Sequence, residues 1–212
     1  MPKISLAKIL RGRLLEIAEL QDLLMVELSR RFNFVLHGGT AVWRIYGGKR
    51  FSYDVDVYLE KPEDVIRLLS DVGWAKLTKH GITGTGRASI RIEDRVPVEL
   101  EISPPPEGLK PVDGDFWLAD GTSMVVKTLA PEDLLREKVN AFIERRKARD
   151  LYDVYYLLDF CGREMIRDSI GKLLPLLESP PGDFDGLGEL VLVGRAPDFD
   201  AIKSKVREYA EG

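Results

Sequence analysis

The segment FVLHGGTAVWRIYGGKRFSYDVDVY, residues 34–58, constrains the fold more than any other part of the chain. A short apolar run ends at two glycines, which predicts a buried strand followed by a tight turn. The next residues have helical spacing and stop at Gly47-Gly48, a pair typical of a helix end. Residues 53–60 alternate between polar and β-branched or other apolar side chains, which predicts a second strand. Strand, helix and strand in such a short stretch predict a core of mixed helices and strands.

The rest of the chain extends this pattern. We predict a helix at residues 5–31, with Ser5 as its N-cap, and another at residues 62–72 that Pro62 opens. Strands are expected at residues 74–79, 86–93 and 96–103, as an antiparallel meander, and a last strand at residues 122–129. Helices follow at residues 131–146 and 148–160, and then a mostly helical stretch with a turn at residues 178–188. The predicted fold class is α+β, with an α/β core and N-terminal helix over residues 1–128 and a helical region over residues 129–212.

Composition excludes several classes of protein. No apolar stretch approaches the ~18 residues of a membrane span, and residues 1–10 lack the apolar core of a signal peptide. Cys161 is the single cysteine, so neither a disulfide framework nor a cysteine zinc site is expected. We therefore predict a cytoplasmic protein. The net charge of −4 argues against a chain coated for nucleic-acid binding, although residues 136–149 carry six Lys and Arg against two Glu.

Asp54 and Asp56 are candidate metal ligands. Residues two apart in a strand point to the same side, so these carboxylates should project together, and Ser52 could join them. Hard oxygen ligands on one face suit Mg²⁺ or Mn²⁺. The alternative is a half-exposed strand with a solvated acidic face.

The Gly38-Gly39 turn is a candidate phosphate cradle. Glycines let the backbone approach an anion closely, and the start of the following helix supplies free N–H groups and the positive end of its dipole. The alternative is an ordinary turn between a strand and a helix. A phosphate cradle just upstream of paired aspartates would suit a nucleoside triphosphate and its metal.

Two blocks of the sequence resemble one family. The segment GGTA…RFSYDVDVYL and the segment LAPEDLLREKVNAFIERRKARDLYDVYYLL, residues 129–158, look like the signature blocks of the AbiEii/AbiGii-type nucleotidyltransferases. These belong to the DNA polymerase β-like nucleotidyltransferase superfamily. The resemblance implies a small mixed sheet flanked by helices, with the helical region at residues 129–212 completing the active site.

The resemblance also implies roles for individual residues. Asp54 and Asp56 would bind Mg²⁺ or Mn²⁺, and Glu101 is the best match for the superfamily's third carboxylate, with Glu99 as the alternative. Lys138 would pair with the triphosphate, and Asp150 would orient Lys138 or the acceptor, with help from Arg149. The remaining nucleotide-binding candidates are Gly38, Gly39, Thr40 (where other members have serine), Arg50 and Ser52.

Several nearby residues have competing interpretations. Asp153 is expected to be a structural partner of an arginine in its own block rather than a ligand. Tyr152 and Tyr155 are expected in the core, with stacking on a base as the alternative. Arg145 and Arg146 could lie on a solvated helix face or contact an RNA backbone.

The resemblance favours a metal-dependent enzyme that moves a nucleoside monophosphate from an NTP to an acceptor hydroxyl. It implies the toxin of a toxin–antitoxin or abortive-infection system, with RNA, in particular the tRNA 3′ end, as acceptor and a cognate antitoxin as possible partner. The alternatives are a transferase that modifies a protein or small molecule, and a non-catalytic module that binds a nucleotide or a partner on the same fold.

Overall fold

The structure is a computed structural model that describes residues 6–211. Contacts between Cα atoms divide it into two compact units. Among the described residues, the first unit comprises residues 6–46 and 52–128, and the second comprises residues 47–51 and 129–211. Among residues 6–211, no helix is both long and apolar enough to cross a bilayer.

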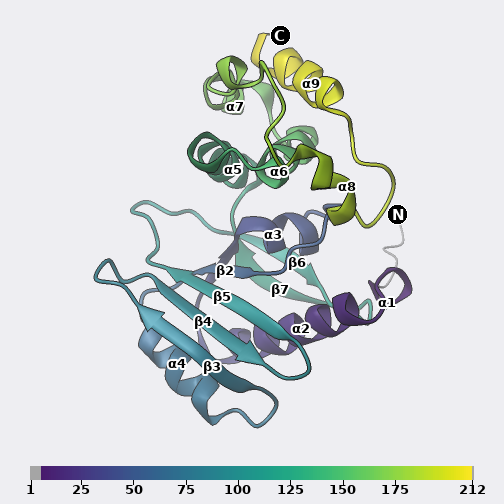
Figure 1. Ribbon diagram of the computed structural model, residues 1–212. Coiled ribbons are helices and arrows are strands. Elements are labelled where there is room, and N and C mark those ends of the chain that lie inside the picture. The colour runs from purple at the N-terminus through teal and green to yellow at the C-terminus, as the bar shows by residue number, and fades with distance from the viewer. Residues whose placement is uncertain (1–5, 212) are drawn as a thin grey trace. The chain divides into compact units, whose positions relative to one another are not determined.

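Over residues 6–46 and 52–128, the first unit contains a seven-stranded mixed sheet and four helices (Figure 1). The helices are α1 (Leu6–Ile9), α2 (Arg13–Arg31), α3 (Gly38–Arg44) and α4 (Pro62–Asp71). The strands are β1 (Val35–His37), β2 (Val55–Tyr58), β3 (Lys76–Ile82), β4 (Ala88–Glu93), β5 (Pro97–Ser103), β6 (Val112–Trp117) and β7 (Ser123–Thr128). Their order in the sheet is β3-β4-β5-β2-β1-β7-β6.

The centre of the sheet combines parallel and antiparallel pairs. Strand β2 pairs with β1 antiparallel and with β5 parallel, and β1 pairs with β7 parallel. Alternate residues of β2, β4 and β5 are buried, among them Val55, Ile90 and Leu100. Helix α2 contacts β5, and α4 contacts β3 and β4. The polar residues between the buried ones therefore lie on the opposite face of the sheet.

The second unit is helical (Figure 1). It contains α5 (Pro131–Arg145), α6 (Ala148–Leu157), α7 (Arg163–Gly171), α8 (Leu187–Leu190) and α9 (Phe199–Glu211). Three 3₁₀ turns lie at Leu158–Phe160, Leu174–Leu176 and Phe184–Gly186. Its core includes Leu134, Phe142, Leu151 and Ile202, which are fully buried.

The α+β fold class and the antiparallel meander of β3, β4 and β5 are confirmed. Two predictions were wrong in detail. The expected helix at residues 5–31 is interrupted, because Gly12 adopts a positive φ of 52° between α1 and α2; its predicted cap, Ser5, lies outside the described residues. Strand β6 was missed, because its sequence VDGDFW is rich in residues that strands disfavour; pairing with β7 stabilises it instead.

Candidate active site

The turn between β1 and α3 brings the backbone against Asp56. Gly38 has a φ of +68°, in the left-handed region that L side chains rarely adopt. A Cβ at this position would lie 2.6 Å from Asp56 Cγ and closer still to its Oδ2. The first turn of α3 has no side-chain N-cap. Only glycine therefore fits at position 38, because the backbone has a positive φ there and because a Cβ would collide with Asp56.

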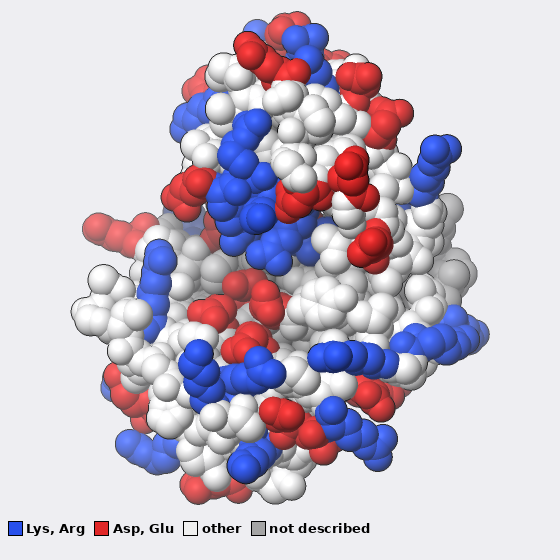
Figure 2. Space-filling view, viewed as in Figure 1, with Lys and Arg blue, Asp and Glu red and all other residues white. Residues whose placement is uncertain are grey.

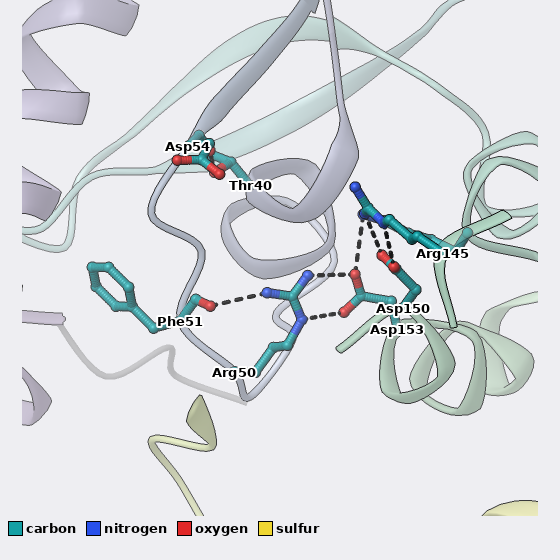
Figure 3. A network of polar contacts seen from close by, with 8 residues as sticks. Thr40, Arg50, Phe51, Asp54, Arg145, Asp150 and Asp153 are labelled. Carbon is teal, nitrogen blue, oxygen red and sulfur yellow. Dashed lines mark hydrogen bonds and ion pairs between the residues drawn. The ribbon is translucent and has the colours of Figure 1, made fainter. Parts of the chain in front are cut away.

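Thr40 ties the glycine turn to the acidic strand. Its Oγ1 donates a hydrogen bond to the backbone carbonyl of Asp54 at 2.5 Å, and the residue is fully buried (Figure 3). The hydroxyl proton is thus used within the protein. The hydroxyl of Thr40 thus holds the backbone of Asp54, and a contact between Thr40 and the nucleotide phosphates stays a prediction.

A side chain of α2 holds the loop that precedes β2 through hydrogen bonds to its backbone. Gln21 is fully buried, and its Nε2 donates to the carbonyl oxygens of Ser52 and Tyr53, both at 3.0 Å. Ser52 itself is buried. No sequence motif pointed to Gln21. The signal that could have found it is that the only glutamine of the chain lies on the apolar face of a predicted helix.

Asp56 and Glu101 lie opposite each other on adjacent strands. They are partners in the parallel register of β2 and β5, so their side chains share one face of the sheet. Burial raises the pKa of Glu101 above its ordinary value; a hydrogen bond with Ser89 opposes this, and the charges of Asp56, Glu99 and Asp54 add to it. The negative charges of both aspartates therefore disfavour ionisation of Glu101. Figure 2 shows acidic side chains gathered where Figure 1 labels β2 and β5.

Glu99 has a different partner. It faces Arg91 in the register of β4 and β5, and Arg91 Nη1 lies 2.9 Å from its Oε1. An ion pair of this kind occupies the carboxylate. Of the two candidates for the third carboxylate, Glu101 is therefore the better placed.

The three carboxylates suit a divalent cation in chemistry. Asp54, Asp56 and Glu101 supply only oxygen ligands, and a cation would relieve the repulsion that contributes to the raised pKa of Glu101. Within residues 6–211, no group of three or more His, Cys, Asp or Glu is already closed tightly enough to hold a metal ion. The three oxygen ligands fit the predicted metal in chemistry. Their side chains would have to move closer together to coordinate one cation.

In the second unit, Asp153 pairs with two cations. Its carboxylate accepts from Arg50 Nε at 2.6 Å and from Arg50 Nη2 at 2.5 Å, and it lies 3.1 Å from Lys138 Nζ. Its side chain is fully buried (Figure 3). Burial by itself would raise the pKa of Asp153, but the charges of Arg50 and Lys138 outweigh burial and lower it.

This network corrects two predictions. Asp153 was expected to pair with an arginine of its own block, yet its partner Arg50 is 103 residues away in sequence. Arg50 was expected to bind the nucleotide, yet its three guanidinium nitrogens contact Asp153 and the carbonyl of Phe51, and it is buried. Arg50 therefore has a structural role, because its side chain is buried and three of its five N–H groups are engaged within the protein.

Asp150 has a partner different from the one expected. It accepts two hydrogen bonds from Arg145, both at 2.7 Å, and its side chain is fully buried (Figure 3). Lys138, which Asp150 was predicted to orient, pairs with Asp153 instead. Asp150 thus positions Arg145 at the junction of α5 and α6. At that junction Arg146 adopts a left-handed φ of 53°, and Arg149 is half-buried.

A family model for the nucleotidyl transferase AbiEii toxin of type IV toxin–antitoxin systems matches residues 23–204. The chain belongs to the AbiEii family. It is therefore a toxin-type nucleotidyltransferase, as its two sequence blocks predicted. No curated protein sequence is significantly similar to it.

Two solved structures have a similar fold. JHP933 from Helicobacter pylori is 22% identical, with a TM-score of 0.64 over 95% of this chain and 92% of that one. MenT4, a nucleotidyltransferase toxin from Mycobacterium tuberculosis, is 19% identical, with a TM-score of 0.64 over 92% of this chain and 82% of that one. At these identities the likeness establishes the fold alone, and the AbiEii family match carries the enzymatic class.

Proposed function

We propose that this AbiEii-family protein transfers a nucleoside monophosphate from an NTP to a hydroxyl group of RNA, with the tRNA 3′ end as the favoured acceptor. One observation carries the proposal. Gly38 packs its backbone against Asp56, and Asp56 lies opposite Glu101 in the sheet. A turn that could hold phosphates and a group of carboxylates that could hold a cation therefore meet at one place in the first unit.

Asp54, Asp56 and Glu101 would hold Mg²⁺ or Mn²⁺. A bound divalent cation would neutralise phosphate charge and favour ionisation of the attacking hydroxyl. The burial of Val55 and Val57 between and beyond the aspartates fixes the strand that carries them. Preorganisation of this kind is the main protein contribution to phosphoryl and nucleotidyl transfer.

Glu101 is suited to accept the proton of the acceptor hydroxyl. The hydroxyl oxygen would bond to the α-phosphorus, the bond from that phosphorus to the β-phosphate oxygen would break, and pyrophosphate would leave. The hydroxyl proton would pass to ionised Glu101. Its place opposite Asp56 in the sheet would put this carboxylate beside the attacking hydroxyl.

The second unit supports RNA as the acceptor. Basic residues follow one another at the junction of α5 and α6, and Figure 2 shows Lys and Arg side chains gathered over these helices. Phosphate contacts from such residues supply most sequence-independent affinity for RNA. We still propose that Lys138 pairs with the triphosphate. Its ammonium group would first have to leave the ion pair with Asp153. A cognate antitoxin is the expected protein partner.

The test is transfer of labelled nucleotide. The protein is incubated with Mg²⁺, total tRNA and each of the four α-labelled NTPs. We expect label in RNA with the wild type, no label with Asp54→Asn/Asp56→Asn, and wild-type labelling with Asp94→Asn. The control Asp94 is an exposed aspartate between β4 and β5.

The other outcomes are equally informative. Label on protein instead of RNA would replace the RNA acceptor with a protein hydroxyl. Binding of NTP with Mg²⁺ but no transfer to any acceptor would favour the non-catalytic module. Full transfer by the double variant would refute the metal-binding role of the aspartates.

A further inference from the structure

A pocket separate from the candidate active site lies entirely within the second unit. It has a volume of about 540 Å³, within the range of small-molecule sites. Its walls come from α6, from the loop that precedes α9 and from Lys49 in the segment 47–51 (Figure 1). None of the residues assigned to the active site above lines it.

Aromatic side chains form one wall. Tyr152, Tyr155 and Tyr156 all project from α6 into the pocket. The rings of Tyr152 and Tyr155 are tilted, with centroids 6.4 Å apart, and Tyr155 and Tyr156 are half-buried. Tyr156 is fixed by its hydroxyl, which donates to the carbonyl of Gly47 at 2.7 Å. Partly exposed tyrosine rings on a rigid helix are suitable surfaces for a planar base.

Two cations at the pocket are free to bind an anion. Lys49 and Arg195 are exposed, and neither side chain makes a hydrogen bond or an ion pair with any residue among 6–211. Each would gain a partner from a phosphate. The backbone of Lys49 is nevertheless anchored, because its carbonyl accepts from the N–H of Leu192 at 2.7 Å.

The two acidic residues of the pocket already have partners. Asp159 lies 2.7 Å from Lys205 Nζ, and Asp198 accepts from the N–H of Ala201 at 2.8 Å in the first turn of α9. One oxygen of each carboxylate is thus already engaged within the protein. This argues against an NTP with its Mg²⁺ and favours a ligand with isolated phosphates, such as a nucleic-acid strand.

From these contacts we infer that the pocket binds an unpaired nucleotide of an RNA strand, with its base on the α6 tyrosines and its flanking phosphates on Lys49 and Arg195. This inference rests on the proposed function, since it assigns a binding site to the RNA acceptor. Stacking on tyrosine tolerates any base, so the pocket selects unpaired over paired RNA rather than one sequence.

The test measures RNA binding without catalysis. Fluorescence anisotropy follows a labelled RNA of about ten unpaired nucleotides, in the presence of EDTA, together with a duplex of the same sequence. The variants are Tyr155→Leu, which keeps an apolar side chain, and Lys49→Gln/Arg195→Gln, which changes exposed residues only. The matched control is Lys172→Gln, an exposed lysine after α7 in the same unit.

We expect the wild type to prefer the unpaired strand. Tyr155→Leu should weaken its binding about tenfold, as loss of one stacked base does. Lys49→Gln/Arg195→Gln should reduce the slope of log K against log salt concentration by about 1.4, since each single-strand phosphate contact contributes about 0.7. Lys172→Gln should match the wild type.

Two results would overturn the inference. One is wild-type affinity and salt dependence in both pocket variants, with circular dichroism showing that they are folded. The other is a wild type that binds no unpaired RNA at low salt. Failure of the proposed function can be distinguished from failure of this inference. Asp54→Asn/Asp56→Asn should bind RNA as the wild type does, and NTP binding with Mg²⁺ is measured in a separate assay.

Discussion

Replacement of Gly38 by alanine should damage the active site far more than an ordinary glycine substitution. The added Cβ would lie 2.6 Å from Asp56 Cγ, whereas ordinary contact begins at 3.4 Å. Asp56 or the turn would have to move by about an ångström. A displacement of about 1 Å in a catalytic group can reduce the rate about 100-fold. The positive φ adds a cost of about 1–2 kcal/mol in stability, and the forced contact about 1–3 kcal/mol more.

Gly108→Ala separates these two effects. Gly108 has a φ of +73°, close to that of Gly38, but a Cβ there would meet nothing within 4 Å. The Gly108→Ala variant should lose only the stability that a positive φ costs an alanine, about 1–2 kcal/mol, and should keep full activity. Urea denaturation gives the stability of both variants, and transfer of labelled nucleotide gives their activity. Equal activity of Gly38→Ala and Gly108→Ala would refute the argument that the turn is built around Asp56.

Three further predictions concern the charged residues. Asp153→Asn should lower the free energy of unfolding by about 3–5 kcal/mol, measured by urea denaturation, because Arg50 and Lys138 would remain buried without a counter-charge. The pKa of Asp153 is lowered in the folded state, so its stabilisation is present above the ordinary aspartate pKa and is lost as the pH falls through the folded value; thermal denaturation against pH should show this loss in the wild type and not in Asp153→Asn. Glu101→Gln should reduce nucleotide transfer at least 100-fold. Glu99→Gln removes only the partner of Arg91 and should remain within a few-fold of wild type in the same assay. The reverse order of activities would assign the third carboxylate to Glu99.

Local patterns in the sequence were sufficient for much of the first unit. The alternation around Asp54 and Asp56 predicted a strand with both carboxylates on its polar side, and the burial of Val55 and Val57 agrees with that pattern. The glycine pair predicted the turn before α3. These features depend on residues close in sequence, whose steric preferences act before any tertiary contact forms.

Strand β6 shows where local patterns stop. Its Asp-Gly-Asp sequence has low strand propensity, and it becomes a strand because β7 offers hydrogen-bond partners. Gly114 in β6 also packs closely, since a Cβ there would lie 2.8 Å from a side-chain atom of Ile45 in the first unit. Neither effect can be read from composition, because both depend on which strand becomes the neighbour.

The charged partners were the least predictable part of the candidate site. The family resemblance implied a phosphate as the partner of Arg50, and either Lys138 or the acceptor as the partner of Asp150. The structure pairs Arg50 and Lys138 with Asp153, and Asp150 with Arg145. The energy of an ion pair depends on burial and on separations of a few ångströms, and neither quantity is encoded in the order of residues.

The sequence by itself determined the family, the α+β class and the residues that bear the carboxylates, because these follow from local spacing and from two blocks that resemble the family's signature. Only the tertiary structure decided that Glu101 rather than Glu99 faces Asp56, and that segment 47–51 joins the helical unit. The physical reason is that strand register is set by contacts between distant parts of the chain. Glu99 and Glu101 share one face of β5, so a shift of two residues in the pairing of β2 and β5 would exchange them.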